Sequence, residues 1–151
     1  MSTKGLDIFT FVLMPFSSEF DDIYKLGIKE TSKSCGVRAE RLDEQLFGEG
    51  MLDRIYRQID VADFVIADLS ERNPNVFYEL GYAHAKDKIC ILLTKDTADI
   101  PFDLKHKRHI HCPTQILHNF TQLLIIVLVR CPHTSRQKSH NSLYIWSCSS
   151  G

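Results

Sequence analysis

The sequence lacks long hydrophobic runs, which argues against a membrane protein. Its longest apolar run, Leu123 to Val129, is far shorter than the roughly 20 residues that a membrane-spanning helix needs. The first residues, Met1 to Asp7, contain no apolar core of the kind found in signal peptides. We therefore expect a cytoplasmic protein with no membrane partner.

An excess of charge of either sign is also lacking. The net charge is −1 at pH 7, so no overall basic field would attract nucleic acid or an anionic membrane. We expect no nucleic-acid partner, although a small nucleotide ligand stays open. The hydrophobic fraction of 44% and the length of 151 residues fit one globular domain with a sizeable core.

Paired cysteines are absent too. The five cysteines are scattered, with no Cys-x-x-Cys pair, so the sequence predicts neither a disulfide framework nor a zinc site. His109 and His111 would share a strand face, with His106 and Cys112 nearby, but no further ligand completes a metal set at suitable spacing. We predict no metal and no cofactor.

Glycine-rich phosphate-binding loops are missing from the sequence. Its seven glycines form neither a P-loop nor a Gly-x-Gly-x-x-Gly fingerprint, which argues against dinucleotide binding in the Rossmann manner. A weaker anion-binding candidate is the turn after the first strand, where backbone N–H groups and hydroxyls could meet a ligand. Its residues are Met14, Pro15, Phe16, Ser17 and Ser18.

Strand and helix signals alternate along the chain. This order predicts an α/β fold with a doubly wound, five-stranded parallel sheet, flavodoxin-like with strand order 2-1-3-4-5. One domain would cover residues 1–129, followed by an atypical polar tail over 130–151. The expected strands are 8–14, 37–42, 64–68, 88–94 and 108–112, and the expected helices are 18–34, 50–61, 74–86 and 115–129.

The most informative stretch runs from Ala67 to Ala85. Asp68 ends an apolar strand, Asn73 and Pro74 suit the N-cap and first position of a helix, and Glu79 falls in its second turn. Ligands of open α/β sheets bind at this carboxyl edge of the strands. Two carboxylates there suit chemistry on a sugar or a nucleotide. Each also has a structural explanation, as a loop cap or a solvated helix residue.

Several polar residues near this edge are further candidates for ligand binding. Ser70, Asn73 and Asn75 could bind a ribose or a phosphate, or could satisfy the backbone of their own loop. Arg41, Asp43 and Gln45 follow the second strand and could recognise the edge of a base. The alternative for these three is a surface salt-bridge cluster.

Five segments together resemble bacterial proteins described as nucleoside 2-deoxyribosyltransferase-like, or as nucleotide-binding domains similar to Toll/interleukin-1 receptor (TIR) domains. The resemblance covers about residues 7 to 125, and Asn-Pro-Asn-Val-Phe-Tyr-Glu-Leu-Gly is its most specific motif. The segments are Phe11-Val-Leu-Met-Pro-Phe16, Arg41-Leu-Asp-Glu-Gln45, Ala67-Asp-Leu-Ser70, Asn73-Pro-Asn-Val-Phe-Tyr-Glu-Leu-Gly-Tyr-Ala-His-Ala85 and Ile100-Pro-Phe-Asp-Leu-Lys105.

The resemblance implies an N-glycosidase or deoxyribosyltransferase-like enzyme acting on a nucleoside, nucleotide or NAD-like molecule. Glu79 would attack the anomeric carbon of the sugar, and Asp68 would orient the sugar or manage the proton of the leaving base. A homo-oligomer is also implied. The loop from Ser70 to Asn75 replaces the acidic, glycine-containing loop of well-studied transferases. Transfer, hydrolysis and a non-catalytic TIR-like module that senses nucleotides or signals are therefore all retained.

Overall fold

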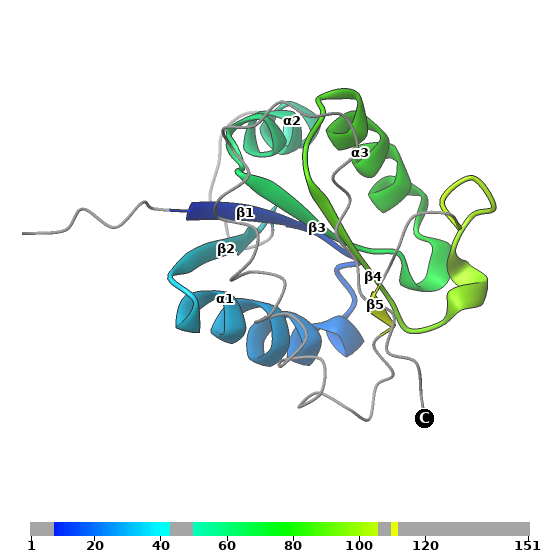
Figure 1. Cartoon of the computed structure of the whole chain (residues 1–151), viewed down its shortest axis with the longest axis horizontal. Coiled ribbons are helices and arrows are strands. Elements are labelled where there is room, and N and C mark those ends of the chain that lie inside the picture. Colours follow the sequence, from blue (N-terminus) through cyan, green and yellow to red (C-terminus); the bar gives the residue numbers. More distant parts are fainter. Residues whose placement is uncertain (1–7, 43–49, 106–109, 112–151) are drawn as a thin grey trace, which may run out of the picture.

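The computed structural model describes residues 8–42, 50–105 and 110–111 (Figure 1). The expected helix over 115–129 and the polar tail over 130–151 lie outside these residues. In chain order, the elements are β1 (Ile8–Leu13), the 3-10 helix η1 (Ser18–Phe20), the π-helix η2 (Ile23–Lys29), α1 (Glu30–Ser34), β2 (Val37–Arg41), α2 (Met51–Val61), β3 (Phe64–Asp68), the 3-10 helix η4 (Ser70–Arg72), α3 (Pro74–Ala85), β4 (Cys90–Thr94), the 3-10 helix η5 (Thr97–Asp99) and β5 (Ile110–His111).

The strands form one sheet in the order β2-β1-β3-β4-β5, and every pairing between neighbours is parallel. The α/β fold with a parallel sheet, predicted from the alternation of strand and helix signals, is confirmed. Of the expected strand over 108–112, residues 110 and 111 are described, and they form the edge strand β5. The order changes direction between β1 and β3, so their carboxyl ends flank a crevice.

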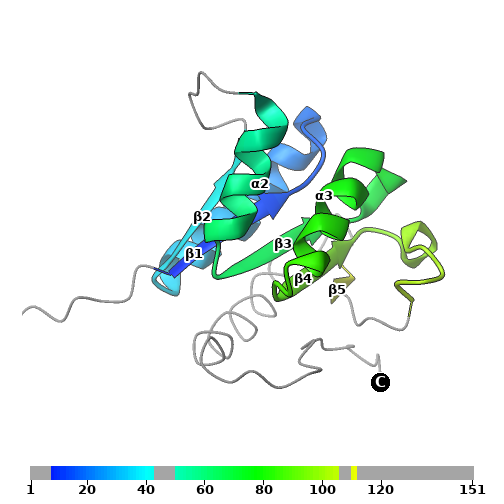
Figure 2. The ribbon, with the colours of Figure 1, turned by 90° about the horizontal axis from the view of Figure 1, so that it is seen from above.

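Both faces of the sheet are covered by helices (Figures 1 and 2). Every residue of β3 and of β4 is buried, as expected for strands packed on two sides. Alternate side chains enter two separate cores. Val12 and Ile66 pack with Tyr24 and Ile28 of η2. Phe11, Leu13 and Val65 pack on the other face with the apolar sides of α2 and α3.

The helix expected over 18–34 is confirmed over these residues, but the type of its turns changes along its length. It is divided into η1, the π-helix η2 and the short helix α1. Gly27, a poor helix former, lies inside η2. Tyr24 of the same π-helix is fully buried, and its hydroxyl accepts a hydrogen bond from the backbone N–H of Arg41 at 3.0 Å. A contact with β2 that periodicity cannot reveal therefore accompanies the distorted segment.

The other two described helices begin and end within one residue of their expected bounds. Within 8–42, 50–105 and 110–111, no helix combines the length and apolar character needed to cross a bilayer.

Candidate active site

The loop between β3 and α3 brings the most informative stretch of sequence to the carboxyl edge of the sheet. Asn73 is the N-cap of α3, and its side-chain oxygen accepts hydrogen bonds from the backbone N–H groups of Asn75 and Val76, at 3.0 and 3.4 Å. Pro74 occupies the first helical position. The predicted cap is confirmed, and it fixes where α3 begins.

Glu79 lies in the second turn of α3 and is half-buried. Loss of solvent around the carboxyl raises its pKa from the ordinary value of 4.5 to about 7. Desolvation disfavours the charged form of a carboxyl, which explains the direction. A carboxyl with a pKa near neutral pH is present in both protonation states under physiological conditions, as acid–base and nucleophilic chemistry often requires.

A cavity of about 240 Å³ opens beside Glu79 between β1, α2 and α3. Its volume is slightly below the roughly 300–1,000 Å³ of pockets for drug-sized ligands, so it suits a small molecule. The wall is mostly apolar with a few polar groups, the usual character of a ligand site. The lining residues are Phe11, Val12, Leu13, Met14, Pro15, Phe16, Met51, Leu52, Ile55, Asn73, Asn75, Val76, Tyr78 and Glu79.

The cavity collects half of the residues that the sequence nominated for the site. Met14, Pro15, Phe16, Asn73, Asn75 and Glu79 line it. Four others, namely Ser17, Arg41, Asp68 and Ser70, do not belong to its lining. Asp43 and Gln45 lie outside the described residues.

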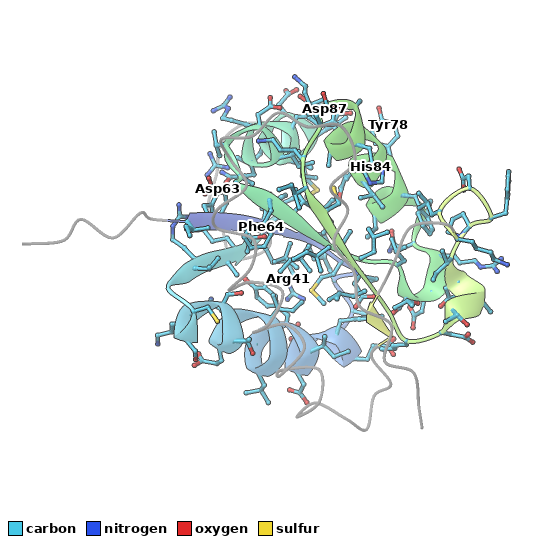
Figure 3. All side chains as sticks on the ribbon, in the orientation of Figure 1. Arg41, Asp63, Phe64, Tyr78, His84 and Asp87 are labelled. Carbon is cyan, nitrogen blue, oxygen red and sulfur yellow. The ribbon has the colours of Figure 1, made fainter. Side chains whose placement is uncertain are left out.

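Arg41 is buried on the opposite side of the sheet from Tyr78 (Figure 3). Its guanidinium lies 2.8 Å from a carboxylate oxygen of Asp21 and 4.5 Å from the centroid of the Tyr24 ring. This hydrogen bond with Arg41 is the main cause of the lowered pKa of Asp21. The guanidinium is also 5.8 Å from the centroid of the Phe16 ring, which lines the cavity.

Asp68 and Ser70 hold the loop after β3 in shape. A carboxylate oxygen of Asp68 accepts a hydrogen bond from the backbone N–H of Ser70 at 2.9 Å. The Ser70 hydroxyl accepts one from the backbone N–H of Lys95, also at 2.9 Å. Burial raises the pKa of Asp68 despite these contacts. The structure thus shows the loop-capping contact for Asp68, whereas the Ser70 hydroxyl binds the backbone at the end of β4.

The turn expected to hold an anion already contains a carboxylate of the protein. The Ser17 hydroxyl donates a hydrogen bond to Glu19 at 3.3 Å. Glu19 in turn lies 3.3 Å from the ammonium of Lys95, and the hydrogen bond with Lys95 is the main cause of its lowered pKa. An anionic ligand at Ser17 would have to approach this carboxylate.

The loop between β3 and α3 contains two residues in the left-handed region of backbone space, Glu71 with φ 62° and Arg72 with φ 51°. Neither is glycine, so the conformation is strained. Contacts with η5 hold it: the Glu71 backbone N–H donates to Asp99 at 2.9 Å, and the Arg72 guanidinium contacts the carbonyl of Ala98. This docking sets the path by which the chain reaches the N-cap of α3.

Sequence reasoning missed the contribution of α2 and of Tyr78 to the site. Met51, Leu52 and Ile55, in the first turns of α2, form one side of the cavity. A usable signal was the predicted start of this helix at the carboxyl edge of β2.

In the part of the chain that the structure describes, no group of three or more His, Cys, Asp or Glu side chains is placed to hold a metal ion.

A search found no matching family model and no matching curated protein. Solved structures do match the fold. One is a 2-deoxyribosyltransferase from Leishmania mexicana, 22% identical with a TM-score of 0.52, where the match covers 60% of this chain and 66% of that one. Another is a 2-deoxyribosyltransferase from the bacterium Bacillus psychrosaccharolyticus, 13% identical with a TM-score of 0.58, covering 73% and 90%. A third is a CMP N-glycosidase from Clostridium botulinum, 18% identical with a TM-score of 0.62, covering 79% and 98%.

The fold is nucleoside 2-deoxyribosyltransferase-like. At these identities the likeness concerns the fold alone. The match also spans just under two thirds of the Leishmania protein, at 66% of its length.

Proposed function

We propose that this protein binds a nucleoside or nucleotide in the cavity beside Glu79 and breaks its N-glycosidic bond. The observation that carries the proposal is a half-buried carboxyl with a pKa of about 7, on the wall of a small cavity at the carboxyl edge of the sheet. The names of the three proteins of similar fold support it, because each describes a deoxyribosyltransferase or an N-glycosidase.

In the proposed reaction, an oxygen of the Glu79 carboxylate forms a bond with the anomeric carbon of the sugar. The bond between that carbon and the base nitrogen breaks, and its electron pair moves to the base. The transition state has oxocarbenium character, as in glycoside hydrolysis by retaining enzymes. Attack by water on the glycosyl–Glu79 ester would complete a hydrolysis, whereas attack by a second base would complete a transfer.

The apolar surroundings of Glu79 favour this role. A carboxylate with few water contacts has little hydration shell to lose when it attacks, and with a pKa of about 7 a substantial part of it is still ionised at neutral pH. Phe16 offers aromatic surface at the cavity, suited to the flat face of a base. Asn73 and Asn75 offer amide groups suited to sugar hydroxyls.

The proton-handling role of Asp68 stays a prediction. Its contact with Ser70 offers a clean test, because Asp68→Asn keeps the side-chain oxygen that accepts the Ser70 N–H. If Asp68 only shapes the loop, the variant should retain activity. If it takes part in proton transfer, activity should fall while the fold is kept. The homo-oligomer, the NAD-like ligand and the TIR-like signalling module also stay predictions.

The test of the proposal is a chromatographic assay of the purified protein. Deoxynucleosides, deoxynucleoside monophosphates, CMP and NAD would each be incubated with wild type and with Glu79→Gln, with and without a second free base. Glu30→Gln is the matched control, because Glu30 is exposed on α1, which covers the other face of the sheet. We expect wild type and Glu30→Gln to release base, and Glu79→Gln to release none.

Formation of a new nucleoside only when a second base is present would assign transfer, whereas release of free sugar would assign hydrolysis. Equal turnover by wild type and Glu79→Gln would exclude Glu79 as the nucleophile. Binding of a nucleotide without any base release by wild type would favour a sensing module instead.

A further inference from the structure

Two tyrosine hydroxyls meet at the cavity beside Glu79. The hydroxyl of Tyr56 on α2 donates a hydrogen bond to that of Tyr78 on α3, with an oxygen–oxygen distance of 3.0 Å. Tyr78 directly precedes Glu79 and lines the same cavity, and 62% of its surface is exposed (Figure 3). This hydroxyl pair joins α2 to α3, the two helices that contribute to the cavity wall.

Neighbouring groups hold Tyr56 in place. Its ring stacks on that of Tyr82, with centroids 4.1 Å apart and an interplanar angle of 24°. The Tyr82 hydroxyl donates to the carboxylate oxygens of Asp60, at 3.1 and 3.2 Å. Stacked aromatic rings with satisfied hydroxyls form a stiff support. The partner of Tyr78 is therefore positioned before any ligand arrives.

The Tyr78 hydroxyl still has a proton that it can donate to a further acceptor. The two hydroxyls carry two protons, and the bond between them uses only the proton of Tyr56. That hydrogen bond, followed by loss of solvent and then by nearby groups that include Glu79, raises the pKa of Tyr56 to about 12. Tyr56 thus remains a donor across the working pH range. Tyr78 keeps its own proton for an acceptor in the cavity.

We propose that the Tyr78 hydroxyl donates a hydrogen bond to the nucleobase as it leaves. The inference rests on the proposed function, in which the electron pair of the glycosidic bond moves onto the base. A hydroxyl next to a carbonyl oxygen or ring nitrogen of the base stabilises this developing charge more than it stabilises the intact substrate. Tyr78 keeps its proton in this step, and the released base anion takes a proton from water.

A purely structural role of the pair predicts something different. If the two hydroxyls only join α2 to α3, removing either one would affect stability, without regard to the chemistry of the leaving base. The test therefore compares bases of one ring system that differ in acidity: thymidine, deoxyuridine and 5-fluorodeoxyuridine for a pyrimidine-specific enzyme, or deoxyguanosine and its 7-methyl derivative for a purine-specific one. A more acidic base needs less help to leave.

We expect Tyr78→Phe to lower kcat by about 10- to 100-fold for the poorest leaving base, since loss of a transition-state donor costs up to about 10²–10³-fold. The loss should shrink for the most acidic base, and KM should change little. Tyr82→Phe is the matched control, because it removes a hydroxyl from the same cluster that binds Asp60 and does not line the cavity. In Tyr82→Phe, kcat should depend on the acidity of the leaving base as it does in wild type.

The loss of kcat in Tyr56→Phe should lie between the losses in Tyr78→Phe and Tyr82→Phe, because Tyr78 then loses its oriented partner but keeps its hydroxyl. Thermal denaturation would establish that each variant is folded. The inference is overturned if Tyr78→Phe shows the wild-type dependence on the leaving base, or if Tyr82→Phe reproduces its effect. Absence of base release by wild type would overturn the proposed function, and this inference with it.

Discussion

Glu79 should destabilise the folded protein at neutral and alkaline pH, so Glu79→Gln should raise its free energy of unfolding there. Burial raises the pKa of this carboxyl from 4.5 to about 7. The unfolded chain would ionise the group near its ordinary value. Between these two pH values, the folded protein therefore holds a proton that the unfolded chain has already released.

The sign and size of the effect follow from this difference. Because the folded pKa is the higher one, the contribution of Glu79 to stability falls as the pH rises from about 4.5 to about 7, and is constant outside that window. At about 1.4 kcal/mol per pKa unit, the full penalty is about 3 kcal/mol. Solvent that still reaches the half-buried side chain reduces it, so we expect about 1–3 kcal/mol. The amide of Glu79→Gln does not titrate and escapes the penalty.

Urea unfolding followed by circular dichroism, at several values between about pH 5 and about pH 8, would measure the difference between variant and wild type. The gain of Glu79→Gln should be small at the acidic end and largest at the alkaline end, with equal m values. Glu30→Gln, exposed on α1, serves as the control for removing a carboxylate. A gain of the same size at every pH would refute the argument, and so would no gain at alkaline pH. Either result would mean that the cavity does not desolvate Glu79.

Three further predictions concern the pH dependence of activity, the N-cap of α3 and two glycines. Activity per enzyme should rise with pH through about 7, because only the ionised Glu79 attacks; a pH–rate profile of kcat that falls through this range would contradict it. Asn73→Ala should lower the unfolding free energy by about 1 kcal/mol, since it removes the acceptor for two N–H groups of α3, whereas Asn73→Asp should be tolerated; urea unfolding compares them. Gly36→Ala should cost about 1–2 kcal/mol, because the φ of Gly36 is +72°. Gly81→Ala should instead stabilise α3 by up to about 1 kcal/mol, because nothing lies within 4 Å of the added carbon, and opposite changes in Tm would verify the pair.

Local sequence signals predicted much of what positions the site. Apolar strand runs and amphipathic helices mark β1, β3, β4, α2 and α3 because their periodicity depends only on which face is buried. The N-cap at Asn73 and the position of Glu79 followed from capping chemistry, which involves residues no more than three apart. The first helix was predicted with its bounds, but its π-helical part η2 was not, since η2 accompanies a contact with β2.

Long-range contacts decided which protein groups the candidate side chains bind. Arg41 was a candidate for base recognition; it is paired with Asp21 and does not line the cavity. Ser70 was a candidate for sugar or phosphate binding, yet its hydroxyl holds the end of β4 through Lys95. Neither partner is near in sequence, and a polar residue gives no local indication of which distant group it will bind.

The sequence by itself determined the alternation of elements and the carboxyl edge where a site would lie, and it named Glu79 as a candidate there. Only the tertiary structure decided that Glu79 borders a small apolar cavity, that its pKa is near 7, and that Tyr56 and Tyr78 meet beside it. Capping and periodicity are properties of neighbouring residues. Desolvation and the pairing of hydroxyls from α2 and α3 depend instead on how separate elements pack, and no short stretch of sequence specifies that.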